Sequence, residues 1–350
     1  MIEVLVVEDS AVVREFLTHI LDSDPGIHVV GTAQDGEEAV KAVAQTKPDV
    51  ITMDINMPKL DGFEATRRIM ETCPTPIVIV SGSWDTGEVA TAFRAVEAGA
   101  LAVLARPLGL GHPDHAKTAG ELVQTVKLMS EVKVVRRWPH LRREPVVLPA
   151  PPGMQVRRAA ADVRLVAIGA STGGPQVLQT ILSDLPKSYP VPVLIVQHIA
   201  AGFVQGLVEW LAQTSGFPVH VAIHGERLLP GHAYVAPDGL HLGVDGNGGG
   251  IALSTGEPEN GLRPAVSHLF RSVSRAYGPH AVGVLLTGMG KDGAQELKEM
   301  REAGALTLAQ DKHSSVVFGM PGEAVALEAA VHVLAPEAIG RVLASLADRK

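Results

Sequence analysis

The sequence has a single cysteine in 350 residues and no apolar run long enough to span a membrane. One cysteine, Cys73, excludes an internal disulfide and fits a reducing compartment. Met1-Ile2-Glu3 leads directly into an apolar stretch, without the basic segment that begins a secretion signal. We therefore expect a cytoplasmic protein without membrane insertion. Cys73 is expected to be structural, because no histidine lies near it and a proline follows it.

Positive charge is scarce at both ends of the chain and concentrated in its middle. Residues 1–125 carry 19 acidic and 9 basic side chains, and residues 165–350 carry 16 and 12, which gives net charges of −10 and −4. Residues 126–164 carry 9 basic and 3 acidic side chains, a net charge of +6, and are rich in proline. We interpret 126–162 as a solvated basic linker between domains 1–125 and 163–350. No helix-turn-helix is recognisable, so we expect no nucleic-acid partner.

Strand-like and helix-like segments alternate through the first domain, which predicts a parallel sheet covered by helices. The expected strands are Ile2–Val7, Ile27–Ala33, Asp49–Met53, Pro76–Val80 and Ala102–Ala105. In such sheets functional groups gather where the strands end at their carboxyl edge. Five polar residues stand at or just after those ends: Glu8, Asp9, Asp54, Ser81 and Arg106.

Three of these strand-end residues are carboxylates, which repel one another unless a cation neutralises them. All-oxygen ligation of this kind suits Mg²⁺, which keeps waters for a phosphate donor. With the segment MDINMPKLDG (Met53–Gly62), the pattern resembles a response-regulator receiver domain of the flavodoxin-like (βα)5 type. The resemblance implies that Glu8, Asp9 and Asp54 hold Mg²⁺ and that Asp54 accepts a phosphoryl group from a histidine kinase.

Two positions of the receiver pattern bear on its switch. The resemblance implies that the Ser81 hydroxyl bonds the phosphoryl group. Receivers have a lysine before the proline that follows the fifth strand, where this chain has Arg106. The planar guanidinium group of arginine replaces the compact ammonium group of lysine at this position. Val103 stands near the place of the usual aromatic switch residue. Phosphorylation at Asp54 is expected, and these two positions leave open how it is coupled to the output.

The second domain opens on a serine at a sharp turn. The apolar run Leu165–Ile168 ends in Gly169-Ala170-Ser171-Thr172-Gly173-Gly174, and Pro175 then opens a helix. Gly169, Ser171 and Gly173 fit G-x-S-x-G, the pattern of a turn that exposes a nucleophilic hydroxyl at a strand end. A phosphate-binding or purely structural glycine loop is the alternative for this motif.

Further strands of this domain end in a histidine and in aspartates. Pro192–Val196 ends at His198, Ala281–Leu286 leads to Asp292, and Leu306–Ala309 ends at Asp311. The chain order Ser-His-Asp differs from that of α/β-hydrolases. Parallel strands would bring Ser171, His198 and Asp292 to one edge as nucleophile, base and orienting group. His313 is a rival base and Asp311 a rival orienting group, which strand-end position does not separate.

A β-rich insert interrupts this alternation. It comprises the expected strands Ala233–Ala236, Leu240–Val244 and Ile251–Thr255, with a hairpin turn at residues 245–250 between the last two. The domain is thus expected to be a doubly wound, mainly parallel α/β fold with a β-hairpin insert. No cluster with metal-ligand spacing is visible in this half, so we expect hydrolysis without a metal.

Four separated motifs carry a second resemblance: GASTGG, VQH, LLTGMGKDGA and AQDKHSSVVFGMP. From about Val163 onward the chain resembles the catalytic domain of the CheB family of protein-glutamate methylesterases. The resemblance implies Ser171 as nucleophile, His198 as base and Asp292 as orienting group, with Asp311 structural. It also implies an oxyanion hole, for which the candidate backbone amides are those of Met289 and Thr172.

The family resemblance implies a phosphorylation-regulated serine esterase. Its substrates would be glutamate γ-methyl esters on chemoreceptors, with deamidation of receptor glutamines through the same acyl intermediate. Two other functions stay open from the sequence. One is the same chemistry in a non-chemotactic chemosensory pathway, and the other is a catalytically weak adaptor that binds receptors.

Overall fold

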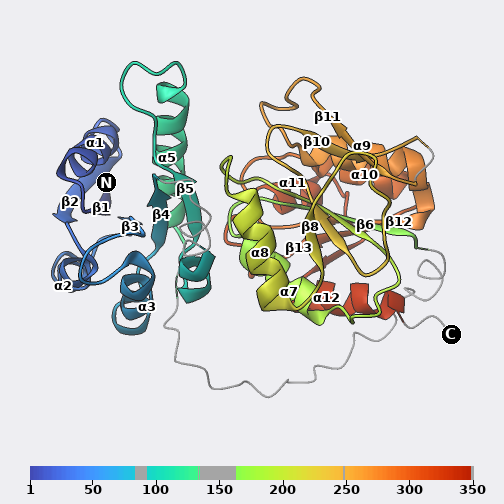
Figure 1. Ribbon diagram of the computed structural model, residues 1–350, viewed down its shortest axis with the longest axis horizontal. Helices are drawn as coiled ribbons and strands as arrows, with labels where there is room; N and C mark the ends of the chain where they lie inside the picture. Colours follow the sequence, from blue (N-terminus) through green and yellow to red (C-terminus); the bar gives the residue numbers. More distant parts are fainter. Residues whose placement is uncertain (83–92, 133, 135–162, 247–248, 348–350) are drawn as a thin grey trace. The chain divides into compact units, whose positions relative to one another are not determined.

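The computed structural model describes residues 1–82, 93–132, 134, 163–246 and 249–347 (Figure 1). The chain divides into two compact units, Met1–Pro145 and Val146–Lys350. Within the described residues, no helix has the length and apolar character needed to cross a membrane.

The first unit is a five-stranded parallel sheet in the order β2-β1-β3-β4-β5. Its strands are mostly apolar, and β3, β4 and the last four residues of β1 are buried, as expected for a sheet covered on both faces. They are β1 (Ile2–Val7), β2 (Ile27–Ala33), β3 (Val50–Met53), β4 (Ile77–Ser81) and β5 (Ala102–Ala105). Its helices include α1 (Ala11–Asp22), α2 (Gly36–Thr46), α3 (Gly62–Thr72) and α5 (His115–Ser130). The predicted receiver-type architecture is confirmed.

The end of α5 corrects the predicted start of the linker. This helix continues to Ser130, five residues past the boundary drawn at 125. Leu122, Val126 and Met129 recur at helical spacing and are buried. The apolar face of this helix therefore continues into the first residues of the predicted linker. Residues 133 and 135–162 lie outside the described residues.

The second unit is a seven-stranded sheet in the order β14-β13-β12-β6-β7-β9-β8, with parallel pairing throughout. At its centre β6 (Leu165–Ala170) lies between β12 (Ala281–Leu285) and β7 (Val193–Gln197). The outer strands are β13 (Leu306–Gln310), β14 (His332–Leu334), β8 (Val219–Val221) and β9 (Ala233–Val235).

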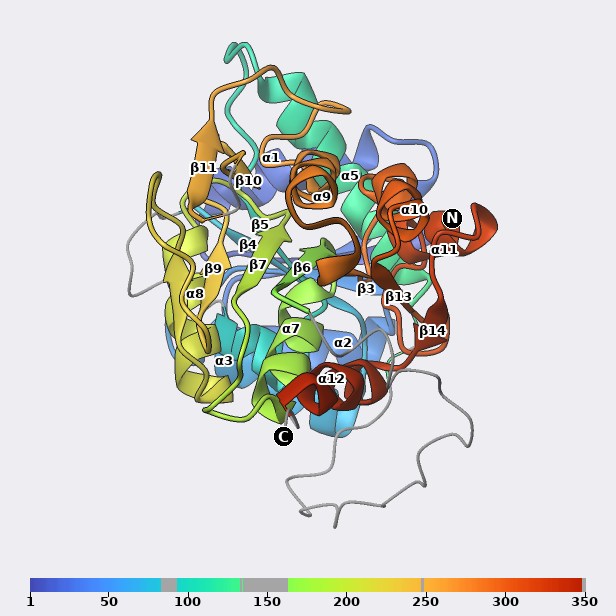
Figure 2. The same ribbon diagram turned by 90° about the vertical axis from the view of Figure 1, so that its right-hand side faces the viewer.

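Helices cover this sheet on both sides, which confirms the predicted doubly wound α/β fold. Figure 2 shows α7 (Gly174–Asp184) and α12 (Pro336–Ala344) below the strands and α9 (Val266–Tyr277) and α10 (Ala294–Glu302) above them. The unit also contains α8 (Val204–Ser215), α11 (Met320–Ala326) and the 3-10 turns η2 (Gly278–His280) and η3 (Ser345–Ala347). The core under α9 and α10 includes Leu194, Phe270 and Met300.

The predicted β-rich insert is correct for only two of its three strands. β10 (His241–Val244) and β11 (Ile251–Ser254) pair antiparallel as a separate hairpin. The third, β9, is instead a strand of the main sheet, between β7 and β8. Its three residues are all buried, as in a parallel strand covered on both faces, but a segment this short gives no periodic signal in the sequence. The hairpin turn at 245–250 lies partly outside the described residues.

Candidate functional site

Ser171 lies in a turn that only glycine permits on either side. It follows the last residue of β6, and α7 begins at Gly174 after Gly173, whose φ is +79°. A Cβ on Gly169 would come within 2.3 Å of Val266, and one on Gly173 within 2.6 Å of Val316. The half-buried Ser171 is therefore held at the carboxyl end of the central strand by close backbone packing.

His198 follows the neighbouring strand and is tied to the same edge. Gln197, the last residue of β7, pairs with Ala170, the last residue of β6. The His198 N–H donates to the Ala170 carbonyl at 2.9 Å. The histidine therefore enters the site from the strand beside the one that carries Ser171.

Asp292 completes this group from the loop between β12 and α10. Its Oδ2 lies 2.9 Å from His198 Nε2, and the carboxylate is buried. Oδ2 accepts the Val266 N–H at 2.6 Å and Oδ1 accepts the Ser267 N–H at 3.0 Å. These amides begin α9, whose N-cap residue, Ala265, has no side chain able to cap them.

The contacts of Asp292 set its charge. Burial pushes the pKa of Asp292 upward, but the His198 ring at 2.9 Å and the hydrogen bond from the Ser267 N–H outweigh burial, so this pKa lies below its usual value. The positive end of the α9 dipole favours the same ionised form. An ionised carboxylate only accepts, which places the proton of the neutral His198 ring on Nε2 and leaves the lone pair on Nδ1.

The alternative candidates, Asp311 and His313, make different contacts. Asp311 Oδ1 accepts the Ser314 N–H at 2.9 Å, which makes Asp311 the cap of its own turn. His313 is exposed beside it. Of the two aspartates, Asp292 is the one in contact with His198.

The two amides considered for an oxyanion hole stand next to Ser171. Gly288 packs so closely that an added Cβ would lie 2.6 Å from Ser171 Cβ, and the exposed Met289 follows it. Thr287 Oγ1 donates to the Thr172 carbonyl at 2.9 Å. Within the described residues, the N–H groups of Thr172 and Met289 have no recorded acceptor.

Sequence reasoning missed Gln197, a buried side chain that links the backbones of Ser171 and His198. Its Nε2 donates to the Ser171 carbonyl and to the His198 carbonyl, both at 2.8 Å. Its position as a polar residue ending a buried strand was the available signal. Sequence reasoning also missed the role of the first turn of α9, because nothing local in the sequence marks Val266 and Ser267 as hydrogen-bond partners of Asp292.

At the carboxyl edge of the first unit, carboxylate oxygens of Glu8, Asp9 and Asp54 all lie within 4.8 Å of one another. Glu8 and Asp54 are buried and Asp9 is exposed. Burial, followed by the charge of Asp54, raises the pKa of Glu8 to about 7. Carboxylates at this separation repel one another, and the three oxygen ligands fit Mg²⁺.

Arg106 and Ser81 lie at the same edge. Arg106 Nη2 is 2.9 Å from Glu8 Oε2 and 3.9 Å from Asp54 Oδ2, so the guanidinium occupies part of the acidic edge. Ser81 ends β4 and is buried, and its carbonyl accepts the Arg106 N–H at 2.8 Å. Val103 is a half-buried residue of β5, paired with Ile79.

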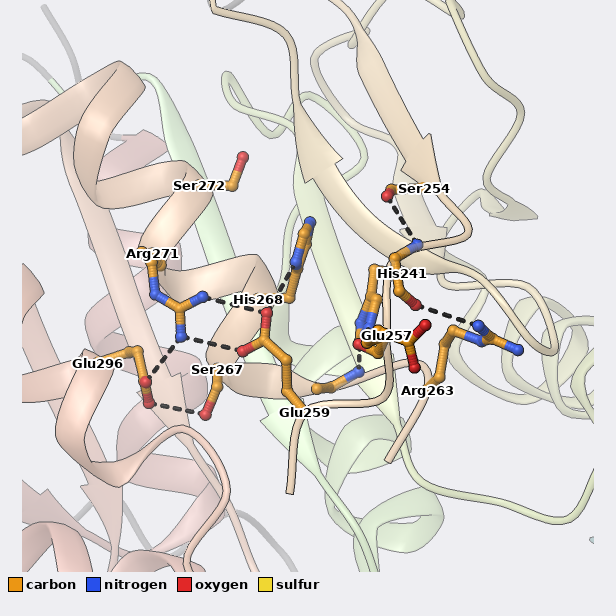
Figure 3. A network of polar contacts seen from close by, with 12 residues as sticks. His241, Ser254, Glu257, Glu259, Arg263, Ser267, His268, Arg271, Ser272 and Glu296 are labelled. Carbon is orange, nitrogen blue, oxygen red and sulfur yellow. Dashed lines mark hydrogen bonds and ion pairs between the residues drawn. The ribbon is translucent and has the colours of Figure 1, made fainter. Parts of the chain in front are cut away.

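A second group of possible metal ligands, not visible in the sequence, is formed by His241, Glu259 and His268 (Figure 3). His241 Nδ1 faces the Ala265 N–H at 3.3 Å, and Nε2 lies 3.0 Å from the Glu257 carbonyl. Both oxygens of Glu259 accept from Arg271. Because their ligand atoms are already used, His241 and Glu259 do not form a metal site.

Comparison with known proteins assigns both halves of the chain. Residues 166–343 match the CheB methylesterase family, and residues 4–112 match the response regulator receiver domain. A Geobacter metallireducens protein named protein-glutamate methylesterase/protein-glutamine glutaminase 4 is 59% identical over 100% of both chains. A Syntrophus aciditrophicus protein named protein-glutamate methylesterase/protein-glutamine glutaminase 1 is 59% identical over 99% of both.

The second unit also has a solved counterpart. The CheB methylesterase catalytic domain of Thermotoga maritima is 37% identical, with a TM-score of 0.51, over 53% of this chain and 98% of that one. With full-length relatives at this identity and a family match over half of the sequence, the chain belongs to the CheB methylesterase family, with a response regulator receiver domain in its N-terminal part.

Proposed function

We propose that this protein hydrolyses glutamate γ-methyl esters on chemoreceptors and deamidates receptor glutamines, under control of receiver phosphorylation. The observation that carries the proposal is the contact of His198 with the buried, ionised Asp292, at the strand edge that presents Ser171. The names of the full-length relatives support both reactions.

The chemistry follows from the roles of these three residues. Ser171 Oγ attacks the ester carbonyl while His198 Nδ1 takes its proton, and Asp292 stabilises the resulting imidazolium. Collapse of the tetrahedral intermediate breaks the C–O bond, and the leaving methoxide takes the proton from His198 and departs as methanol. Water then attacks the acyl-enzyme by the same route and releases glutamate. With a glutamine substrate the first leaving group is ammonia.

Two backbone amides are suited to the oxyanion of these intermediates. Thr172 follows Ser171 in the chain, and Met289 follows Gly288, which packs against Ser171. Within the described residues, the N–H groups of Thr172 and Met289 have no hydrogen-bond acceptor. The Thr172 amide belongs to the turn before α7, where the helix dipole favours negative charge. We assign the oxyanion hole to these two groups.

In the receiver, Asp54 is the proposed phosphoryl acceptor, and a histidine kinase is the proposed donor. Glu8, Asp9 and Asp54 would hold Mg²⁺, which supplies charge neutralisation for the incoming phosphoryl group. Ser81 would donate its hydroxyl to a phosphoryl oxygen. Arg106 keeps a cation beside Asp54, in the place where receivers have lysine. Phosphorylation would control the esterase by shifting the population of two states of the chain.

Methanol release from methylated receptor membranes tests both halves of the proposal. The purified protein is assayed with and without acetyl phosphate plus Mg²⁺, beside Ser171→Ala. We expect release that acetyl phosphate increases and that Ser171→Ala abolishes. Release that persists in Ser171→Ala would refute the assigned nucleophile, and release that ignores the phosphodonor would refute the receiver's role. No release under either condition would favour a receptor-binding adaptor.

A further inference from the structure

Ser267, in the first turn of α9, is hydrogen-bonded to three parts of the second unit, and Figure 3 shows its contact with Glu296. Its N–H donates to Asp292 Oδ1 at 3.0 Å. Its hydroxyl donates to Glu296 Oε2 at 2.7 Å and accepts the Gly293 N–H at 3.1 Å. One residue therefore holds the carboxylate of Asp292 and also the backbone that follows it.

Glu296 fixes the direction of this hydroxyl. A carboxylate only accepts hydrogen bonds, so the Ser267 proton points to Glu296 and the oxygen lone pairs remain for Gly293. Glu296 is itself held by Arg271, whose Nη2 lies 3.0 Å from Oε1. The same guanidinium makes two further bonds to Glu259, at 3.1 and 2.9 Å. Because Arg271 is part of α9 and Glu296 part of α10, these contacts lock the two helices together.

The packing around Gly293 leaves Asp292 little room to move independently of α9. A Cβ on Gly293, whose φ is +81°, would lie 2.4 Å from Val266 Cγ1. Val266 is also the residue whose N–H donates to Asp292 Oδ2 at 2.6 Å. A shift of the first turn of α9 therefore displaces the carboxylate that contacts His198.

We propose that Ser267 and Glu296 are positioning residues for the hydrolytic reaction, which hold the amides of α9 on Asp292 and so hold Asp292 against His198. This inference rests on the proposed function, because it assumes that Asp292 orients the base. Neither side chain is expected to touch substrate, so their loss should act on kcat and leave KM unchanged.

The first test is the steady-state kinetics of Ser267→Ala. This variant keeps the backbone N–H on Asp292 but removes the link to Gly293 and Glu296. We expect kcat to fall about tenfold at unchanged KM, since small misplacements of catalytic groups carry losses of this order. Ser267→Thr keeps the hydroxyl and should restore most of kcat.

A matched control lies on the same helix. The half-buried Ser272 bonds the backbone of Val244 through its hydroxyl, at 2.9 Å from the N–H and 3.2 Å from the carbonyl. Ser272→Ala should therefore lower the thermal stability of the protein about as much as Ser267→Ala does, and it should leave kcat unchanged. A kcat loss in Ser272→Ala equal to that in Ser267→Ala would overturn the inference, because general loosening of α9 would then explain both.

Double variants decide whether the effect passes through Asp292. In an Asp292→Asn background, Ser267→Ala should lower kcat no further, whereas independent effects would multiply. Ser267→Ala with Glu296→Ala should be no slower than the slower single variant. Multiplying effects would overturn the positioning role. If Asp292→Asn itself leaves kcat unchanged, the assigned orienting group is wrong, which separates failure of the proposed function from failure of this inference.

Discussion

Gln197→Met is the most direct test of how the strand ends assemble the active site. Gln197 is 3% exposed, and its Nε2 bridges the carbonyls of Ser171 and His198 at 2.8 Å each. Methionine fills a similar volume without either donor. The substitution therefore removes the link between the backbones of Ser171 and His198 without changing either of these two residues.

The cost to stability is modest because two effects oppose each other. The Ser171 carbonyl keeps its bond from the Gly174 N–H at 2.8 Å, so it loses one of two bonds, worth about 0.5–1.5 kcal/mol. The His198 carbonyl loses its donor, at about 1–3 kcal/mol. Gln197 Oε1 is buried without a donor in the described part of the chain, so its removal returns about 1–3 kcal/mol. The midpoints of these three ranges leave a fall of about 1 kcal/mol in the free energy of unfolding.

The expected loss of activity is much larger. Without the bridge, the turns at Ser171 and His198 can shift independently, and we expect kcat to fall about 10- to 100-fold with little change in KM. Urea unfolding and methanol-release kinetics on the same preparation measure the two effects.

Thr307→Val is the matched control for this variant. The buried Thr307 hydroxyl donates to the Ala329 carbonyl at 2.7 Å, on a strand of the same sheet. Thr307→Val should lower stability by a similar amount and leave kcat unchanged. A Gln197→Met enzyme with kcat within twofold of the wild type would refute the reasoning, and so would an equal kcat loss in the control.

Three further predictions concern single groups. Asp54→Asn should abolish acetyl-phosphate-dependent phosphorylation, read by phosphate-affinity gel mobility, while basal methanol release persists. Gly288→Ala places a Cβ 2.6 Å from Ser171 Cβ and 2.5 Å from Met320 Sδ, so kcat should fall more than about tenfold at unchanged receptor binding by co-sedimentation. The folded-state pKa of Asp292 lies below 3.8, so its contribution to stability is complete above that pH and is lost as the pH falls through the lower folded value. The unfolding free-energy difference between wild type and Asp292→Asn should accordingly shrink as the pH falls below about 4 in urea titrations.

The parts of the site that could be predicted from the sequence are those carried by strand ends. Ser171, His198 and Asp54 each follow a short apolar run, and parallel strands bring their carboxyl ends to one edge whatever their separation in the chain. That rule required no knowledge of loop geometry. It did not separate Asp292 from Asp311, because both follow such strands and only the path of the loop decides which one meets His198.

The parts that could not be predicted depend on partners far apart in the chain. β9 has three residues, too few for a periodic signal, and only its pairing with β7 and β8 places it in the main sheet. Gln197 was visible as a strand-end residue, but its two carbonyl partners follow from the close approach of two turns. The α9 amides that hold Asp292 lie 25 and 26 residues before it, at a helix start that begins with alanine.

That alanine explains how a buried carboxylate can stay ionised here. A helix that starts without a capping side chain loses about 0.5–2 kcal/mol relative to one with a good cap. Asp292 supplies the missing acceptor for the first two amides of α9, and the same amides offset the cost of burying its charge. A local cap at position 265 would compete with Asp292 for these donors. The absence of a capping side chain at Ala265 therefore leaves these amides free to stabilise the ionised Asp292 beside His198. The start of α9 and the orientation of His198 depend on the same carboxylate.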